Sequence, residues 1–170
     1  RGIFVGGAGM KSHLVDVSRS LNLPVCPCYG SSETAGMITL LESGSFLNGI
    51  NGVGSCLPHA EVRLSERNHQ VLIKSSSLCI RRGKRNFATN EWLQTPDFGK
   101  FDPLGNLTIE GRLDRLINTG GEKVDPSRIE KVLHSTGLIE NCLVYGVSDQ
   151  KWGQRVVARI TPADVNLKYL

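Results

Sequence analysis

The sequence predicts an α/β segment, then a small antiparallel, barrel-like β segment, then a small α+β domain. Three observations favour this order. Residues 1–36 show a strand–helix–strand pattern, residues 37–112 alternate apolar and polar positions between turns, and residues 113–170 combine a glycine hairpin with a helix and two strands. We therefore expect residues 1–112 to belong to one domain and residues 113–170 to a second, smaller one.

The N-terminal segment has the pattern of a parallel sheet. The apolar run Gly2–Ala8 predicts a buried strand, Met10–Leu23 a helix and Val25–Tyr29 a second strand. Within Met10–Leu23, three apolar residues recur at helical spacing: Leu14, Val17 and Leu21. Ligand groups gather at the C-terminal ends of parallel strands, and the turns at Gly7 and Gly30 fall at such ends.

Three short segments in the middle of the chain alternate apolar and polar residues: Glu61–Leu64, Val71–Lys74 and Leu107–Glu110. Stretches rich in Gly, Asn, Ser and Asp separate them, as turns do. This part of the chain is therefore expected to form an antiparallel sheet or a small distorted barrel.

The C-terminal part predicts a β-β-α-β-β order. Residues 115–125 read as a hairpin that turns at Gly120 and Gly121, and Asp125 then caps a helix with Pro126 at its first position. Gly137 ends this helix. Its apolar face consists of Ile129, Val132 and Leu133, and two strands follow at Asn141–Val147 and Arg155–Ile160.

The composition limits the kinds of partner. The chain has 170 residues, of which 39% are apolar and 21% charged, and no apolar run long enough to span a membrane. The net charge of +4 is spread over mixed charges, so no nucleic-acid partner is expected. One dense basic run, Arg81, Arg82, Lys84 and Arg85, predicts either a solvated loop or a site for a phosphorylated ligand. The oligomeric state stays open.

The five cysteines are Cys26, Cys28, Cys56, Cys79 and Cys142. Their odd number and scattered spacing do not match a zinc site, which needs two pairs of ligands. Buried free thiols in a reducing cytoplasm are the favoured interpretation.

The segment from Tyr29 to Gly36, YGSSETAG, has the residue types of a nucleotide site. Tyr29 offers a ring on which a base can stack, Ser31 and Ser32 offer hydroxyl groups, and Glu33 offers a carboxylate for Mg²⁺. The alternative is a polar turn capped by serines. The upstream run GGAGMKS is not a phosphate loop, because Met10 separates Gly9 from Lys11.

Five motifs in fixed order resemble those of the adenylate-forming acyl-CoA synthetases, a family that also includes luciferases and peptide-synthetase adenylation domains. They are YGSSE (29–33), NGVGSCLPHAEVRL (51–64), TPD (95–97), GRLD (111–114) and VYGVSDQKWGQRVVA (144–158). The resemblance implies that residues 1–112 end the large AMP-binding domain. Residues 113–170 would then begin the small, mobile C-terminal domain.

The resemblance also implies roles for individual residues. Eight residues are implied in binding the nucleotide: Gly7, Ala8, Tyr29, Gly30, Ser31, Ser32, Asp97 and Arg112. Glu33 would bind Mg²⁺, Asp114 would be the hinge, and Gly120, Gly121 and Glu122 would line the tunnel for CoA. The carboxylate of Asp97 could accept hydrogen bonds from the two hydroxyls of a ribose, and the guanidinium of Arg112 suits the anionic adenylate. The alternative for a lone Asp or Arg on a hairpin is a weak surface ion pair. Pro96, where the family has glycine, makes the role of Asp97 less secure.

The stretch INTGGEKVDPSRIE (117–130) resembles the acyl- and aryl-CoA ligases within the family, and GGAG at residues 6–9 favours the subgroup that activates o-succinylbenzoate in menaquinone or phylloquinone synthesis. The expected substrates are a small carboxylic acid, ATP with Mg²⁺, and CoA. A carrier protein as acyl acceptor, or a nonenzymatic nucleotide- or acyl-CoA-binding module, remain alternatives.

The chain has no initiator methionine and opens almost directly into a strand. The family's phosphate-cradling loop lies upstream of the motifs found here and its catalytic lysine downstream. We therefore expect a C-terminal fragment that carries no catalytic residue and is inactive alone.

Overall fold

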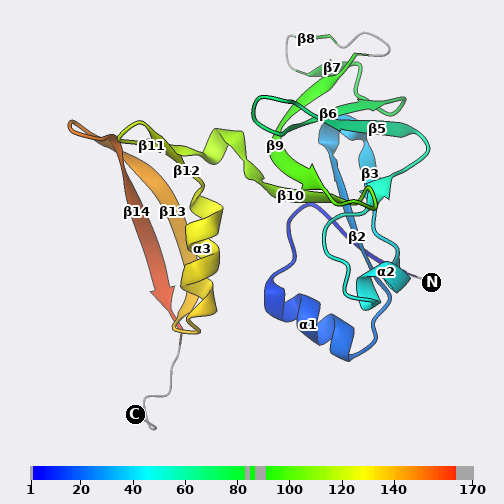
Figure 1. Ribbon diagram of the computed structural model, residues 1–170, viewed down its shortest axis with the longest axis horizontal. Helices are drawn as coiled ribbons and strands as arrows, with labels where there is room; N and C mark the ends of the chain where they lie inside the picture. The colour runs from blue at the N-terminus through cyan, green and yellow to red at the C-terminus, as the bar shows by residue number, and fades with distance from the viewer. Residues whose placement is uncertain (1, 83–84, 87–90, 164–170) are drawn as a thin grey trace. The chain divides into compact units, whose positions relative to one another are not determined.

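The computed structural model describes residues 2–82, 85–86 and 91–163 (Figure 1). The chain divides into two compact units, Arg1–Glu110 and Gly111–Leu170. Lys84 of the basic run lies outside the described residues. Of the rest of that run, the structure gives only a short strand pair, β7 (Arg81–Arg82) with β8 (Arg85–Asn86).

The first unit is built mainly from strands. Besides β7 and β8, its elements in chain order are β1 (Ile3–Val5), α1 (Ser12–Ser20), β2 (Val25–Ser31), the short 3-10 helix η1 (Ser32–Thr34), β3 (Gly36–Leu40), α2 (Ser43–Leu47), β4 (Ser55–Cys56), β5 (Ala60–Leu64), β6 (Gln70–Ser75), β9 (Leu93–Phe101) and β10 (Leu107–Arg112). The last two residues of β10 belong to the second unit.

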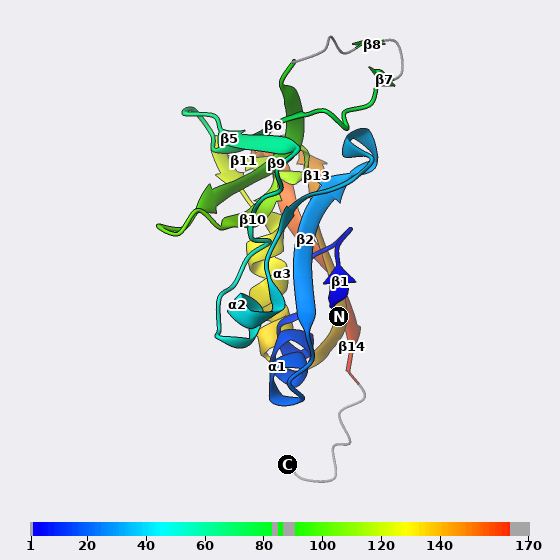
Figure 2. The same ribbon diagram turned by 90° about the vertical axis from the view of Figure 1, so that its right-hand side faces the viewer.

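The first sheet has the order β1-β2-β3-β4 and is mixed. Figure 2 shows β1 beside β2. β1 and β2 are parallel, with Ile3 opposite Val25, as expected for strands joined through a helix. β3 then pairs with β2 antiparallel, because η1 reverses the chain within a few residues and leaves no room for a crossover. The α/β portion and the β-rich portion therefore share one sheet, which the sequence did not indicate.

Helix α1 forms where it was expected, but its apolar stripe does not pack inward. Leu14, Val17 and Leu21 are 47%, 50% and 62% exposed, whereas Ser18 is the buried residue of the helix. Arg19 ties the helix to the unit by donating to the carbonyl oxygens of Phe46 and Ile50, at 2.9 Å each. The prediction of the helix was right, and the assumption that its stripe faces the core was wrong.

The second sheet of this unit has the order β10-β9-β6-β5 and is curled and antiparallel, as the alternating segments predicted. Its inner face supplies Val71, Ile73 and Leu93 to a core cluster that also contains Ile38 of the first sheet. Tyr29 packs against this cluster. The ring of Tyr29 thus lies where the two sheets share a core, and this packing limits how far it can move.

The second unit has the expected β-β-α-β-β order. Its elements are the 3-10 helix η2 (Leu113–Arg115), β11 (Ile117–Thr119), β12 (Glu122–Val124), α3 (Pro126–Ser135), β13 (Ile139–Asp149) and β14 (Gly153–Pro162). The sheet order is β12-β11-β14-β13, and α3 packs against β13 (Figure 1). Asp125 caps α3 by accepting a hydrogen bond from the backbone N–H of Ser127 at 2.9 Å.

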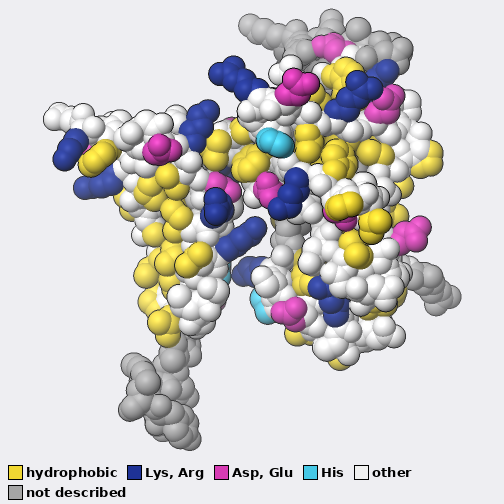
Figure 3. Space-filling view, in the orientation of Figure 1, with side chains coloured by type: hydrophobic (Ala, Val, Ile, Leu, Met, Phe, Trp, Pro, Cys, Tyr) yellow, Lys and Arg dark blue, Asp and Glu magenta, His cyan; other side chains and the backbone are white. Residues whose placement is uncertain are grey.

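The packing of the second unit departs from the sequence pattern at two places. Val132, expected on the inner face of α3, is 67% exposed. On the β13–β14 hairpin, where Figure 3 shows hydrophobic side chains at the surface, Leu143 and Ile160 are 53% and 52% exposed. Over the described ranges no helix is long and apolar enough to cross a membrane. All five cysteines are free thiols, of which Cys26 is buried but Cys56 is exposed.

Candidate nucleotide site and the glycine hairpin

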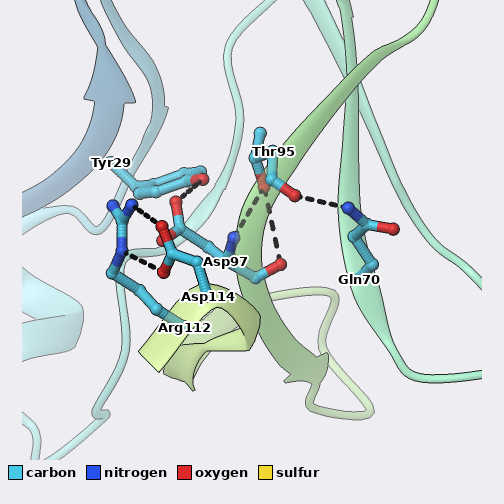
Figure 4. A network of polar contacts seen from close by, with 6 residues as sticks. All are labelled: Tyr29, Gln70, Thr95, Asp97, Arg112 and Asp114. Carbon is cyan, nitrogen blue, oxygen red and sulfur yellow. Dashed lines mark hydrogen bonds and ion pairs between the residues drawn. The ribbon is translucent and has the colours of Figure 1, made fainter. Parts of the chain in front are cut away.

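Two residues that are far apart in the sequence meet in the first unit. The hydroxyl of Tyr29 donates to Oδ2 of Asp97 at 2.6 Å, a short contact of the kind expected between a hydroxyl and a carboxylate (Figure 4). Both side chains are half-buried. An ionised carboxylate has about four lone-pair positions, of which Tyr29 occupies one. The contact therefore orients the carboxylate of Asp97.

A bulge in β9 positions the side chain of Asp97 and also accommodates Pro96. Gln94 lies opposite Leu72 and Phe98 opposite Gln70, so residues 95–97 bulge out against the single residue Val71. A bulge has no regular ladder bond to lose, and proline is tolerated in such places because it lacks an N–H. The bulge thus accommodates Pro96 in β9, and the role of Asp97 stays a prediction.

Thr95 holds this bulge together. Its buried hydroxyl donates to the carbonyl oxygen of Val71 at 2.8 Å and accepts from the backbone N–H of Asp97 at 3.2 Å. Its own carbonyl oxygen accepts from Nε2 of Gln70 at 2.6 Å (Figure 4). The hydroxyl of Thr95 thus links β6 to the backbone of Asp97 across the bulge, so Thr95 and Gln70 position Asp97 without themselves being candidate ligands.

The turn after β2 brings serine hydroxyls close to Tyr29. Gly30 faces β3 so closely that a Cβ atom there would lie 1.9 Å from the carbonyl oxygen of Gly36. Only glycine fits at this position, because the backbone of β3 fills the space of a side chain. The buried hydroxyl of Thr34 accepts from the backbone N–H of Ser31 at 2.8 Å and donates to the carbonyl oxygen of Gly36 at 2.7 Å, which fixes the turn.

Ser31 carries an unusual side chain. Its Oγ is buried and has no hydrogen-bond partner among the described residues. A buried hydroxyl left unpaired costs about 1–3 kcal/mol, so such groups call for an explanation. A polar ligand group that bonds to this oxygen would remove the cost. Of the next two residues, Ser32 is exposed and Glu33 is half-buried.

The donor set around Glu33 fits Mg²⁺ only if a nucleotide supplies further ligands. Over the described residues, no group of three His, Cys, Asp or Glu side chains lies close enough together to hold a metal ion. Mg²⁺ commonly binds one or two carboxylates together with substrate phosphates and water. Glu33 would then be the protein's contribution, and the nucleotide would bring most of the remaining oxygens.

The turn that follows β1 is exposed. Gly7 has φ +84°, and no atom would contact a Cβ at this position within 4 Å. Gly6 is more restricted, because a Cβ there would lie 2.8 Å from Sγ of Cys28. Gly7 and Ala8 therefore follow the end of β1 beside the strand that leads to Tyr29, at the edge where a parallel pair places its ligand groups.

Arg112 and Asp114 belong to the second unit and pair with each other. Nε of Arg112 donates to Oδ1 of Asp114 at 3.0 Å, and Nη2 donates to Oδ2 at 2.7 Å (Figure 4). The hydrogen bonds and the charge of Arg112 hold the pKa of Asp114 below its usual range. Both side chains are about half exposed, so the pair contributes little to stability despite its two-bond geometry.

The hairpin of the second unit turns as predicted. Ile117 pairs with Val124 and Thr119 with Glu122, and Gly120 and Gly121 have φ +59° and +87°. These values belong to the left-handed region that tight two-residue turns need and that glycine adopts at least cost. Gly120, Gly121 and Glu122 are all exposed.

The structure thus joins Tyr29 to Asp97 and places Ser31 two residues further along the same strand. Sequence reasoning assigned Tyr29 a stacking role and missed its hydroxyl contact. It also missed Thr95 and Gln70. The threonine is part of the TPD motif and could have been suspected, whereas no sequence signal marks Gln70, because its partner is a backbone oxygen on another strand.

Curated proteins similar to this chain are acyl-CoA ligases, although no family model matches it. A 2-succinylbenzoate–CoA ligase of Listeria innocua is 31% identical over 94% of this chain and 35% of its own length. A long-chain-fatty-acid–CoA ligase of Mycobacterium tuberculosis is 33% identical over 98% of this chain and 35% of its own length. The chain therefore spans about a third of the length of the curated relatives it matches.

Solved structures lead to the same group of enzymes. The o-succinylbenzoate CoA synthetase of Bacillus subtilis, in complex with its acyl-adenylate intermediate, matches with a TM-score of 0.83 and 26% identity. The match covers 97% of this chain and 37% of that chain. The same enzyme in complex with ATP and magnesium ion matches with a TM-score of 0.79, over 94% of this chain and 36% of that chain.

Proposed function

We propose that this chain, a homologue of acyl-CoA ligases over nearly its whole length, carries part of the active site of an ATP-dependent acid–CoA ligase. In the proposed reaction a carboxylate oxygen attacks the α-phosphorus of ATP and pyrophosphate leaves. The thiol of CoA then attacks the carbonyl carbon of the acyl-adenylate, and AMP leaves. The observation that carries the proposal is the hydrogen bond between Tyr29 and Asp97, which links two of the five motifs.

The contacts in the first unit suggest how it would bind the nucleotide. Asp97, held by Thr95 and Tyr29, would accept from the two ribose hydroxyls. The ring of Tyr29 would contact the base, and the unpaired hydroxyl of Ser31 would bond to an oxygen of the adenylate. Ser32 and the Gly7–Ala8 turn complete the proposed nucleotide contacts, and Gly30 allows the strands to pack beneath them.

The second unit would contribute in both half-reactions. The guanidinium of Arg112 is a fork that suits the anionic adenylate, and Asp114 is the proposed hinge. The backbone of Gly120 and Gly121, with Glu122, would border the path of the pantetheine arm of CoA, since glycine lets a thin ligand approach closely. Glu33 would supply a carboxylate to Mg²⁺, which neutralises phosphate charge when it is bound.

The proposed acid is o-succinylbenzoate. Ligases of this acid recur among the sequence relatives and among the solved structures. A ligase of long-chain fatty acids is equally similar, however, at 33% identity, so similarity over this third of the enzyme does not separate the two acids. We base the choice on the recurrence of o-succinylbenzoate ligases in both comparisons.

The reaction is tested on the protein encoded by the complete reading frame. It is supplied with ATP, CoA and one acid at a time, including o-succinylbenzoate and a long-chain fatty acid, and acyl-adenylate and thioester are measured separately. We expect thioester from o-succinylbenzoate. Thioester from the fatty acid alone would overturn the proposed substrate. Binding of AMP without acyl-adenylate from any acid would overturn the ligase reaction and favour a binding module.

The role of Asp97 is tested with Asp97→Asn in the same protein. Asparagine keeps a neutral acceptor, and a hydrogen bond to a charged group is worth about 1 kcal/mol more than a neutral one, so loss of the charge toward two hydroxyls is expected to weaken AMP binding by about 30-fold. Asp16→Asn is the matched control, since Asp16 is exposed on α1. Equal AMP affinity of the Asp97→Asn variant and the control would exclude the proposed contact.

A further inference from the structure

The turn between β13 and β14, residues 149–154 with the sequence DQKWGQ, has no role in the function proposed so far. It lies against the glycine hairpin of the same unit. The backbone N–H of Asn118 donates to Oε1 of Gln154 at 2.8 Å, and the N–H of Gly120 donates to the carbonyl oxygen of Trp152 at 2.9 Å. Between these two bonds Thr119 lies opposite Gly153. Three consecutive residues of the hairpin are thus held by the turn.

The indole of Trp152 packs over one of the two turn glycines. A Cβ atom at Gly120 would lie 2.8 Å from Cε3 of Trp152, closer than real Cβ contacts come, whereas a Cβ at Gly121 would meet nothing within 4 Å. The ring of Trp152 therefore occupies the space that a side chain at position 120 would need. This difference between two adjacent glycines with similar φ provides a matched pair for experiment.

The turn is itself held in shape. Oδ1 of Asp149 accepts from the backbone N–H groups of Lys151 and Trp152, at 2.9 and 3.0 Å. Gly146, opposite Val156 on the hairpin, leaves room for the side chain of Gln154, because a Cβ there would lie 2.9 Å from its Nε2. The residues that surround Gln154 and Trp152 thus fix both contacts to the glycine hairpin.

We propose that residues 149–154 act as a clamp that sets the position of the Gly120–Gly121 hairpin, with Gln154 and Trp152 as positioning residues for the CoA-dependent step. The hairpin has only three residue pairs of its own, and two-stranded hairpins of this kind are marginal in water. The two hydrogen bonds to Trp152 and Gln154 restrict the motion of the hairpin backbone. The functional part of this inference rests on the proposed ligase function, whereas the structural part does not.

The structural part is tested by amide hydrogen exchange on the 170-residue chain. Gln154→Ala is expected to speed exchange at Asn118 by about fivefold or more, as loss of one hydrogen bond predicts. Gln154→Glu, whose carboxylate also accepts from an N–H, is expected to restore protection. The amide of Val144, which donates to Glu130, is the internal reference and should not change. Unchanged exchange at Asn118 in Gln154→Ala would overturn the clamp, whatever the enzyme does.

The packing of Trp152 is tested by a double-mutant cycle read at the amides of the hairpin. Both Gly120→Ala and Gly121→Ala place an alanine at positive φ and should loosen the hairpin. Only the effect of Gly120→Ala is expected to shrink when Trp152→Ala removes the ring. The effect of Gly121→Ala should be equal in both backgrounds. Equal coupling of Trp152 to the two glycines would overturn the proposed contact.

The functional part is tested on the protein encoded by the complete reading frame, with the two half-reactions measured separately. In Gln154→Ala the KM for CoA is expected to rise about fivefold in proportion to the lost hairpin order, with the rate of acyl-adenylate formation unchanged and with recovery in Gln154→Glu. Faster amide exchange without a change in the KM for CoA would overturn the positioning role. Absence of both half-reactions in the unmutated protein would overturn the ligase function and leave the exchange test of the clamp intact.

Discussion

The hydroxyl of Tyr29 offers a direct test of the nucleotide site. Tyr29→Phe keeps the ring and its packing against the shared core but removes the donor that lies 2.6 Å from Oδ2 of Asp97. Asp97 is half-buried, so water can replace the lost donor only in part. We therefore expect a loss of about 1–1.5 kcal/mol in the ordering of the carboxylate, which corresponds to roughly 5- to 10-fold weaker AMP binding.

The assay is isothermal titration calorimetry with AMP on the protein encoded by the complete reading frame. Tyr29→Ala removes the ring as well, and lost stacking is expected to weaken binding by a further factor of about 10, because base–aromatic stacking is worth about 1–3 kcal/mol. Tyr145→Phe is the matched control, since Tyr145 lies on β13 of the other unit and is 40% exposed. AMP affinity equal to the control in Tyr29→Phe would refute the claim that the hydroxyl orients Asp97.

Two further predictions concern the second unit. Glu130 accepts from Nη2 of Arg115 at 2.8 Å and from the backbone N–H of Val144 at 2.9 Å. Glu130→Gln is therefore expected to destabilise this unit by about 1–2 kcal/mol, measured as faster amide exchange at Val144. Glu140 is exposed, and Glu140→Gln should have no effect on that exchange. The pKa of Asp114 is lowered by Arg112, so the stability from this pair is present above about pH 3.9 and is lost as the pH falls through the lower folded pKa. An NMR titration should show the pKa of Asp114 below its ordinary value and a return toward that value in Arg112→Gln, and an unchanged pKa in that variant would contradict the assignment.

Much of the fold followed from local signals. The hairpin at Gly120–Gly121 was predictable because a two-residue turn demands positive φ at both positions, and the helix after Asp125 because the cap and Pro126 mark its start. The packing faces were less predictable. The apolar stripe of α1 is exposed and Val132 of α3 is exposed, since periodicity shows which residues share a face but not what covers that face.

The sequence by itself determined the chemical groups of the candidate site and their order along the chain. Tyr29, Asp97, Arg112 and the glycine pair were identified from motifs that resemble those of the adenylate-forming acyl-CoA synthetases, and short motifs can be recognised without knowing how strands pair. Their roles in binding AMP, Mg²⁺ and CoA stay predictions.

Only the tertiary structure decided which of these groups lie in contact. Contacts between distant segments depend on strand register, and register is set by packing of the whole sheet rather than by neighbouring residues. The bulge that accommodates Pro96 brings Asp97 to the hydroxyl of Tyr29. By the same reasoning, the motif around Trp152 was recognisable in the sequence, but its contact with Gly120 became visible only when β14 was placed beside β11.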